Sequence, residues 1–189
     1  MKPSLLRTTF AVVLGSAAQA QPAVYTIDPT HTFVSLEFVQ GGLSTQRVRF
    51  DRKQGSVQFD RTARSGQVEL SVPTDSLNSG IGAFDQRLKS SEFFDVAQHP
   101  AARFVSERFI FSGDRVVEVI GSLTLRGRTQ PISFRALNFN CYTSPLFRRE
   151  VCGGDFEATL QRSQWGLGAL PAAAADDVRL LVQIEAIRQ

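Results

Sequence analysis

Two side chains near the start of the chain are the first candidates for chemistry. Asp28 and His31, in the stretch DPTH, place a carboxylate and an imidazole three residues apart. Such a pair can orient a general base, but no nucleophile for it is evident, and the sequence has no G-x-S-x-G, H-E-x-x-H or phosphate-loop motif. An aspartate in a turn also hydrogen-bonds its own backbone. The pattern therefore favours a turn before the first long strand, and we expect no catalytic residues.

Arg162 is the second candidate, because it follows the alternating apolar residues of DFEATLQR in phase. If those residues face a core, Arg162 faces it too, and a buried charge needs a partner. Two alternatives remain open: an internal carboxylate such as Asp28 or Asp85, or the polar head of a ligand. Trp165, the single tryptophan of the chain, either contacts that ligand or plugs the end of the core.

The chain has two cysteines, Cys141 and Cys152. A close pair in an exported protein predicts a disulfide, whereas two buried free thiols are the alternative. A metal site is not expected, because the cysteine spacing is not C-x-x-C and the histidines, His31 and His99, lie far apart.

Residues 1–20 read as a secretory signal peptide: Lys2 and Arg7 precede an apolar run, and Ala18-Gln19-Ala20 is an A-x-A cleavage pattern. No cysteine follows the cleavage point, so we expect no lipid anchor, and no other stretch is long enough for a membrane span. The expected product is a soluble periplasmic protein.

Residues 21–189 are expected to form a single domain. The net charge of the whole chain is +3, and removing Lys2 and Arg7 lowers it by two to +1. The basic residues are spread along the chain. We therefore expect no nucleic-acid partner.

Alternation of apolar and polar residues dominates this domain and predicts about nine short strands. Turn residues separate them, and several connections are short enough for hairpins. Neighbouring short strands favour an antiparallel meander, so a sandwich and a closed barrel both fit. The clearest alternating stretches are FVSLEF, QVELSVP, RVVEVIGSLTL, PISFRA and VRLLVQIEA. In ARFVSERFIF the parity is mixed, because Phe104 and Phe109 fall on opposite faces.

One segment, residues 79–94, does not alternate. Phe84 and Leu88 are spaced i, i+4, which predicts a short amphipathic helix, with Asp85 and Lys89 paired on its solvated face. The adjacent aromatics Phe93 and Phe94 follow it. We expect this segment to cover the barrel and to turn at least one of these two rings inward.

Two motifs carry a resemblance that spans Tyr25 to about Ala186. The first, D-x-x-L…F-F-D…P…F-x-S, runs from Asp85 to Ser106, with its serine one residue out of step at Ser91. The second, G-x-L-T-x-x-G-x-T-x-P, runs from Gly121 to Pro131. With YTIDPTHTFVSLEF and RSQWG, they make the chain similar to the YceI-like family of exported lipocalin-like proteins.

The resemblance implies an all-β fold: an eight-stranded antiparallel lipocalin-like barrel with one short covering helix. It implies a long apolar tunnel that holds an isoprenoid or lipid chain, such as a polyprenyl phosphate, a quinone or a fatty amide, and no cofactor or catalytic machinery. Some members are associated with cytochrome b-type membrane proteins, and a homodimer is compatible with the family. A non-catalytic interaction module with a filled interior is the alternative. The cavity volume distinguishes the two: a continuous tunnel of roughly several hundred Å³, the size of known ligand sites, fits a carrier, whereas isolated pockets fit a filled interior.

On such a barrel, the inward-facing residues and the lid are the expected ligand contacts: Val34, Leu36, Phe38, Val48, Phe50, Phe84, Leu88, Phe93, Phe94, Phe104, Phe134, Leu160, Arg162 and Trp165. The chain departs from the family pattern at Gln40, where a histidine is usual, at Arg49, where a glycine is usual, and in the cysteine-bounded stretch CYTSPLFRREVC. This stretch is expected to shape one rim of the barrel or to serve a partner.

Overall fold

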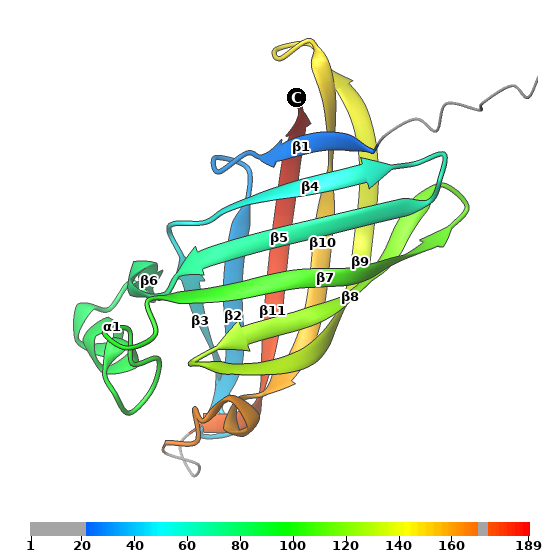
Figure 1. The fold of residues 1–189 in the computed structure, drawn as a ribbon. Coiled ribbons are helices and arrows are strands. Elements are labelled where there is room, and N and C mark those ends of the chain that lie inside the picture. Colours follow the sequence, from blue (N-terminus) through cyan, green and yellow to red (C-terminus); the bar gives the residue numbers. More distant parts are fainter. Residues whose placement is uncertain (1–21, 170–173) are drawn as a thin grey trace, which may run out of the picture.

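Antiparallel strands make up most of the computed structural model, which describes residues 22–169 and 174–189 (Figure 1). The expected signal peptide, residues 1–20, lies outside the described residues. The strands are β1 (Ala23–Ile27), β2 (Phe33–Gln40), β3 (Ser44–Phe50), β4 (Gln54–Asp60), β5 (Ser65–Pro73), β6 (Leu77–Asn78), β7 (Ala101–Ser112), β8 (Arg115–Leu125), β9 (Arg128–Ser144), β10 (Arg149–Gln161) and β11 (Ala174–Arg188). The helical elements are α1 (Gly82–Lys89) and the 3₁₀ turns η1 (Thr74–Ser76) and η2 (Arg162–Trp165).

The sheet closes into a barrel because β1 pairs with both β4 and β11. The closed ring runs β1-β4-β5-β7-β8-β9-β10-β11, which is eight antiparallel strands. Closure leaves no open edge in this ring, so its backbone groups find partners within the sheet. The predicted eight-stranded antiparallel barrel is confirmed.

The chain bends between β1 and β2, which follow one another along β11. β11 pairs with β1 through residues 186–188 and with β2 through residues 178–183. β3 pairs with β2 and then with the short β6, beside which α1 packs (Figure 1). The lower part of the barrel is therefore bordered by β3 and β6, and the covering segment lies next to them.

The covering segment is a shorter helix than predicted. α1 spans Gly82–Lys89, and Leu88 is its buried residue. The backbone N–H of Phe94 donates to the Leu88 carbonyl oxygen at 2.9 Å, which folds the chain back beneath the helix. Phe94 is buried and Phe93 is half-buried, so the adjacent pair turns inward as expected.

Asp85 has a different role from the predicted solvated pairing. Its Oδ1 accepts hydrogen bonds from the Ser79 backbone N–H at 2.7 Å and from the Ser79 hydroxyl at 2.5 Å. These hydrogen bonds lower the pKa of Asp85, and the nearby Lys89 contributes less. Asp85 therefore anchors the loop that leads into α1.

Bulges explain the mixed parity of the longer strands. Between Ser106 and Arg108 the register of β7 against β8 shifts by one residue, so Phe104 and Phe109 both line the interior. A second shift, between Ile110 and Phe111, lies opposite Val117. Val117, which alternation placed with the inward residues of β8, is 36% exposed, whereas Val116 is 2% exposed. An inserted residue reverses which side chains face inward beyond it.

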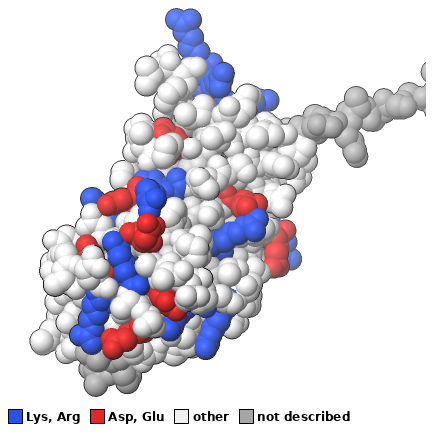
Figure 2. Space-filling view, turned by 60° about the vertical axis from the view of Figure 1, so that its left-hand side comes forward, with Lys and Arg blue, Asp and Glu red and all other residues white. Residues whose placement is uncertain are grey.

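The outer face carries a chain of alternating charges across five strands. From β3 to β9, the order is Arg47, Glu37, Arg179, Glu157 and Arg135, and the Arg47–Glu37 and Arg179–Glu37 contacts are 2.7 and 3.3 Å. Hydrogen bonds from Arg179 and Arg135 lower the pKa of Glu157. Figure 2 shows acidic and basic side chains interspersed over the lower part of the face in view. Within the part of the chain described, no helix is long and apolar enough to cross a membrane.

The predicted disulfide joins Cys141 of β9 to Cys152 of β10. The two residues face each other directly in the antiparallel register, with their Cα atoms 4.1 Å apart. The bond ties β9 to β10 close to the turn of their hairpin, and the two cysteines are 11 residues apart along the chain.

Replacing both cysteines, as Cys141→Ala with Cys152→Ala, should lower the free energy of unfolding by roughly 3 kcal/mol, because an open loop of this length gains chain entropy when unfolded. Denaturant unfolding of the variant and of the oxidised wild type measures the difference. Wild type treated with a reductant is the control and should match the variant. Equal midpoints in all three samples would contradict this account of the bond.

Candidate functional site

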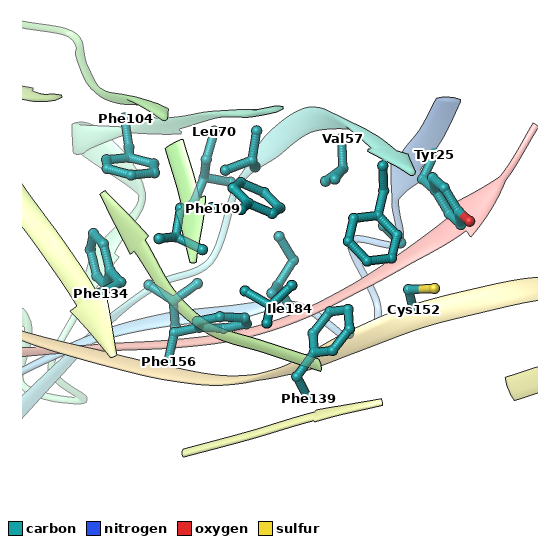
Figure 3. Close-up of a pocket in the computed structure, with 17 residues that line it drawn as sticks. Tyr25, Val57, Leu70, Phe104, Phe109, Phe134, Phe139, Cys152, Phe156 and Ile184 are labelled. Atoms are coloured by element: carbon teal, nitrogen blue, oxygen red, sulfur yellow. The ribbon is translucent and has the colours of Figure 1, made fainter. Parts of the chain in front are cut away.

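The barrel interior contains three adjoining apolar cavities that follow one another from the β9–β10 end to the η2 end. We call them the upper, middle and lower cavities, with volumes of about 90, 60 and 70 Å³. Their walls are carbon almost throughout. Figure 3 shows the upper cavity, with side chains from opposite strands pointing toward one another across it.

Shared side chains form the walls between neighbouring cavities. Leu70, Phe104, Phe134 and Val182 line both the upper and the middle cavity. Leu36, Phe94 and Leu125 line both the middle and the lower cavity. The resemblance implied one long tunnel, whereas the structure divides this row of space by side chains.

Aromatic pairs hold these walls in place. The rings of Phe104 and Phe134 meet edge to face with centroids 5.1 Å apart, and Phe59 and Phe139 do so at 5.5 Å. Phe50 meets Phe94 at 5.9 Å, which fixes the covering segment against β3. Edge-to-face pairs of this kind contribute about 0.5–1.5 kcal/mol each beyond the area they bury.

Most of the residues predicted to contact a ligand lie on this row of cavities. Those lining the upper, middle or lower cavity are Val34, Leu36, Phe38, Val48, Phe50, Leu88, Phe93, Phe94, Phe104, Phe134, Leu160 and Arg162. Phe84 is half-buried against the core and is not among the lining residues of these cavities. That any of them binds a ligand stays a prediction.

Trp165 closes the lower end of the barrel. Its side chain is 2% exposed, and its indole Nε1 donates to the Leu123 carbonyl oxygen at 3.3 Å. It is not among the lining residues of the three cavities. Of the two roles open for it, the structure favours the plug over a ligand contact.

Arg162 combines burial with a position on the lower cavity. Its side chain is 7% exposed, and its guanidinium donates to the carbonyl oxygens of Ala175 at 3.0 Å, Ala169 at 2.8 Å and Ala174 at 3.1 Å, and also to that of Leu167. These partners of the charge are peptide carbonyls, a kind of partner that neither alternative from the sequence had named. Asp28 and Asp85 each make hydrogen bonds elsewhere.

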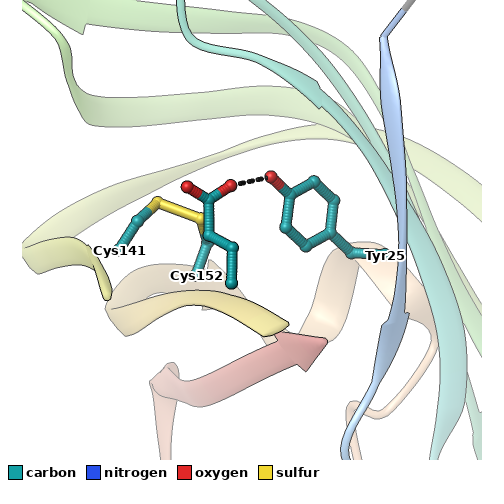
Figure 4. The surroundings of a disulfide bond; sticks show 4 residues. Tyr25, Cys141 and Cys152 are labelled. Carbon is teal, nitrogen blue, oxygen red and sulfur yellow. Dashed lines mark hydrogen bonds between the residues drawn. A yellow bond between two sulfur atoms is a disulfide. The ribbon is translucent and has the colours of Figure 1, made fainter. Parts of the chain in front are cut away.

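A polar pair lies at the opposite end of the interior. The Tyr25 hydroxyl donates to Oε1 of Glu150, beside the disulfide (Figure 4). Burial, with this hydrogen bond and the negative charge of Glu150, raises the pKa of Tyr25 to about 12. The phenol is therefore a neutral donor at physiological pH, and its ring lines the upper cavity.

The sequence predictions missed most of the upper cavity. Its further walls include Tyr25, Phe59, Phe109, Phe139 and Phe156. Phe156 was in phase with Leu160 and Arg162, so alternation could have identified it. Phe139 could not be found that way, because a register shift between Asp155 and Phe156 against β9 changes the parity beyond Ala136.

The Asp28–His31 pair forms the predicted turn. Asp28 Oδ1 accepts from the Thr30 backbone N–H at 2.8 Å, and Oδ2 accepts from His31 Nδ1 at 2.8 Å. Burial of Asp28 opposes ionisation, but the hydrogen bonds from His31 and Thr30 outweigh it and lower the pKa of Asp28 to about 2. The hydrogen bond to Asp28 raises the pKa of His31. These contacts give both side chains a structural role in the turn.

Gln40, which stands where the family usually has histidine, ends β2 on the exposed surface. Its carbonyl oxygen accepts from the Leu43 backbone N–H at 3.0 Å in the turn to β3. Gln40 pairs with Ser44 and with Ala174, and Ala174 lines the lower cavity. The departure from the family pattern therefore lies at the lower end, near Arg162.

Comparison with known proteins gives a consistent result. The family model described as the YceI-like domain matches residues 25–186. A UPF0312 protein of Pseudomonas aeruginosa is 31% identical over 192 residues, covering 98% of this chain and all of the relative.

Two solved structures share the fold at low sequence identity. BcnA of Burkholderia cenocepacia has a TM-score of 0.68 at 19% identity, covering 84% of this chain and 98% of that protein. A polyisoprenoid binding domain from Saccharophagus degradans, implicated in plant cell wall breakdown, has a TM-score of 0.63 at 16% identity, covering 88% of this chain and 99% of that domain.

The Asp28–His31 turn should make stability depend on pH in a defined window. Because the pKa of Asp28 is lowered to about 2 from 3.8, its contribution is complete above the unfolded value and is lost as the pH falls through the folded one. The loss is about 2 kcal/mol in the free energy of unfolding. The raised pKa of His31 acts at the other end: its contribution is complete below 6.5 and is lost as the pH rises through the folded value.

Denaturant unfolding of wild type and Asp28→Asn between about pH 2 and pH 8 measures this dependence. The stability difference between them should be largest between the ordinary pKa values of the two groups. His31→Gln is the matched variant, and it should remove the fall on the alkaline side. A difference that does not change with pH would show that the pair does not couple to folding.

Proposed function

The chain belongs to the YceI-like family, and from this premise and the geometry of its interior we propose that it is a binding protein for a long apolar chain of the isoprenoid or lipid class. The observation that carries the proposal is the row of apolar cavities running from Tyr25 and Cys152 at one end to Arg162 at the other. The polyisoprenoid binding domain from Saccharophagus degradans shares the fold and supports the same ligand class.

An interior of this composition suits a ligand with a long hydrocarbon tail. Transfer of such a tail from water gains about 0.8 kcal/mol per buried methylene group, so the walls alone can supply affinity. Polar groups are needed at an end only, where they orient the ligand. Arg162 and the Tyr25 hydroxyl are the polar groups at the two ends. The positive charge of Arg162 suits a polyprenyl phosphate or a quinone carbonyl, whereas the Tyr25 oxygen, whose proton is donated to Glu150, can accept a hydrogen bond from a fatty amide.

Binding a long chain requires the internal walls to move. The cavities of about 60–90 Å³ are each small beside a ligand of that length, so shared side chains such as Phe94 and Val182 must change position to join them. Phe94 belongs to the covering segment rather than to a strand, which makes it the wall that can move with least disturbance of the sheet.

We assign this binding to the periplasm and propose no catalytic role. The Cys141–Cys152 disulfide supports an oxidising compartment, because such bonds persist outside the cytosol. Asp28 and His31 are engaged in a turn, which supports binding over catalysis. A membrane cytochrome partner and a homodimer stay predictions.

The division of the interior favours one alternative, a non-catalytic interaction module whose core is simply filled. Organic extraction of protein purified from its own host, followed by mass spectrometry, separates the two functions. A carrier should yield a lipid with a long isoprenoid or acyl chain and should take up a polyprenyl phosphate or quinone added to the stripped protein. A clean extract together with failed uptake would exclude the carrier.

Blocking the wall between the upper and middle cavities should reduce ligand capture. Val182 lines both cavities, and Val182→Phe fills the space between them. We expect about tenfold less bound lipid per protein, with an overpacking cost of about 1–3 kcal/mol in the free energy of unfolding. Quantitative mass spectrometry of the extracts measures the change.

The matched control is Leu181→Phe, one residue earlier on β11 and on the outer face of the strand. It should retain wild-type lipid content. Unchanged lipid in Val182→Phe, with its fold confirmed by circular dichroism, would show that the ligand does not cross this wall.

A further inference from the structure

The β9–β10 hairpin extends beyond the barrel wall. β8 pairs with β9 only as far as Arg135, and β11 pairs with β10 only from Val151 onward. Among the described residues, 143–150 therefore have register partners only within the hairpin. Figure 1 shows its turn as the topmost part of the fold, above β1 and the C-terminus.

The end of this hairpin, Tyr142–Arg149, exposes apolar side chains together with positive charge, and we call it the hairpin tip. Tyr142 is 52% exposed, Leu146 81% and Phe147 39%. Arg148 and Arg149 follow, both exposed, and neither forms an ion pair with a carboxylate in the described part of the chain. Figure 2 shows basic atoms at this extremity of the molecule.

The hairpin tip is held in one conformation. The disulfide joins its base, and the Arg148 backbone N–H donates to the Ser144 carbonyl oxygen at 2.8 Å. The Phe147 backbone N–H donates to the Ser144 hydroxyl at 3.3 Å, and Ser144 itself is buried. An exposed apolar group on a preordered turn loses little conformational entropy when it binds.

We propose that the hairpin tip docks on an anionic lipid surface, with Leu146, Phe147 and Tyr142 entering the interfacial region and Arg148 and Arg149 contacting lipid head groups. Exposed aromatic and aliphatic side chains next to unpaired arginines match both parts of such a surface, the apolar boundary and the negative charge. The charge complementarity selects an anionic membrane over a neutral one. This docking does not depend on the ligand proposed above.

Docking in this way also orients the barrel. Cys152 at the base of the hairpin and Tyr25 beside it line the upper cavity, so the docked hairpin tip directs that end of the interior toward the lipids. The Arg162 end then faces away from the surface. In this orientation the upper cavity is the part of the interior nearest the membrane.

Co-sedimentation with vesicles tests the proposal. Wild type should bind vesicles of phosphatidylglycerol mixed with phosphatidylethanolamine, and should bind phosphatidylcholine vesicles much more weakly. The double variant Leu146→Ser with Phe147→Ser should lower the partition coefficient about tenfold. Arg149→Gln should lower it roughly fivefold, and added salt should reduce what remains of wild-type binding.

Leu43 supplies the matched control, because it is 92% exposed on the β2–β3 turn at the other end of the barrel. Leu43→Ser should bind vesicles as wild type does. A Leu146→Trp reporter should shift its fluorescence to shorter wavelength on adding anionic vesicles, whereas Leu43→Trp should not. All these positions are exposed, so each variant should fold, and thermal unfolding is the measurement that checks this.

Three results would overturn the proposal. The first is equal vesicle binding by wild type and the Leu146→Ser, Phe147→Ser variant. The second is no binding to anionic vesicles at all, which leaves the hairpin tip to a protein partner. The third is loss of a dimer in that variant by size-exclusion chromatography without vesicle binding, which makes the hairpin tip a self-association surface. Lipid extraction and uptake are measured separately, so failure here leaves the proposed ligand intact.

Discussion

The structure depends on one strand, β11, making two different pairings along its length. Residues 178–183 pair with β2 and residues 186–188 with β1, and β1 then closes the barrel on β4. Between the two stretches, the Glu185 carbonyl oxygen accepts hydrogen bonds from the Asp28 backbone N–H at 2.8 Å and from the Thr32 hydroxyl at 3.3 Å. The Asp28–His31 turn therefore stands where the first strand bends. Asp28 and His31, although their residue types are common in catalysis, here hold the turn at which the barrel closes.

Closure explains the separation of polar and apolar groups. A closed antiparallel sheet sends alternate side chains inward, so apolar residues from distant parts of the chain share one interior. Charges pair across strands on the outer face, as in the row from Arg47 to Arg135. Arg162 is the exception, since its guanidinium enters the lower end. Burial is acceptable there because the carbonyl oxygens of the segment after η2 solvate the charge.

The ends of the barrel differ in a way that matters for function. At the lower end, Trp165 and Arg162 fasten η2 and the start of β11 across the opening. At the upper end the disulfide and the Tyr25–Glu150 hydrogen bond support a projecting hairpin with an exposed apolar tip. One end is thus closed by hydrogen bonds, and the other presents the hairpin tip that we propose docks on a lipid surface.

The features that depend on local pattern could be predicted from the sequence. Alternation defined strands such as β5 and β11, the i, i+4 pair Phe84 and Leu88 marked α1, and two cysteines in one short stretch predicted the disulfide. The features that depend on strand register needed the three-dimensional structure. Bulges in β7 and β9 bring Phe109 and Phe139 inside, and the fold-back after η2 gives Arg162 carbonyl partners. These outcomes follow from pairing between strands far apart in sequence, and a shift of one residue there changes which face every later side chain occupies.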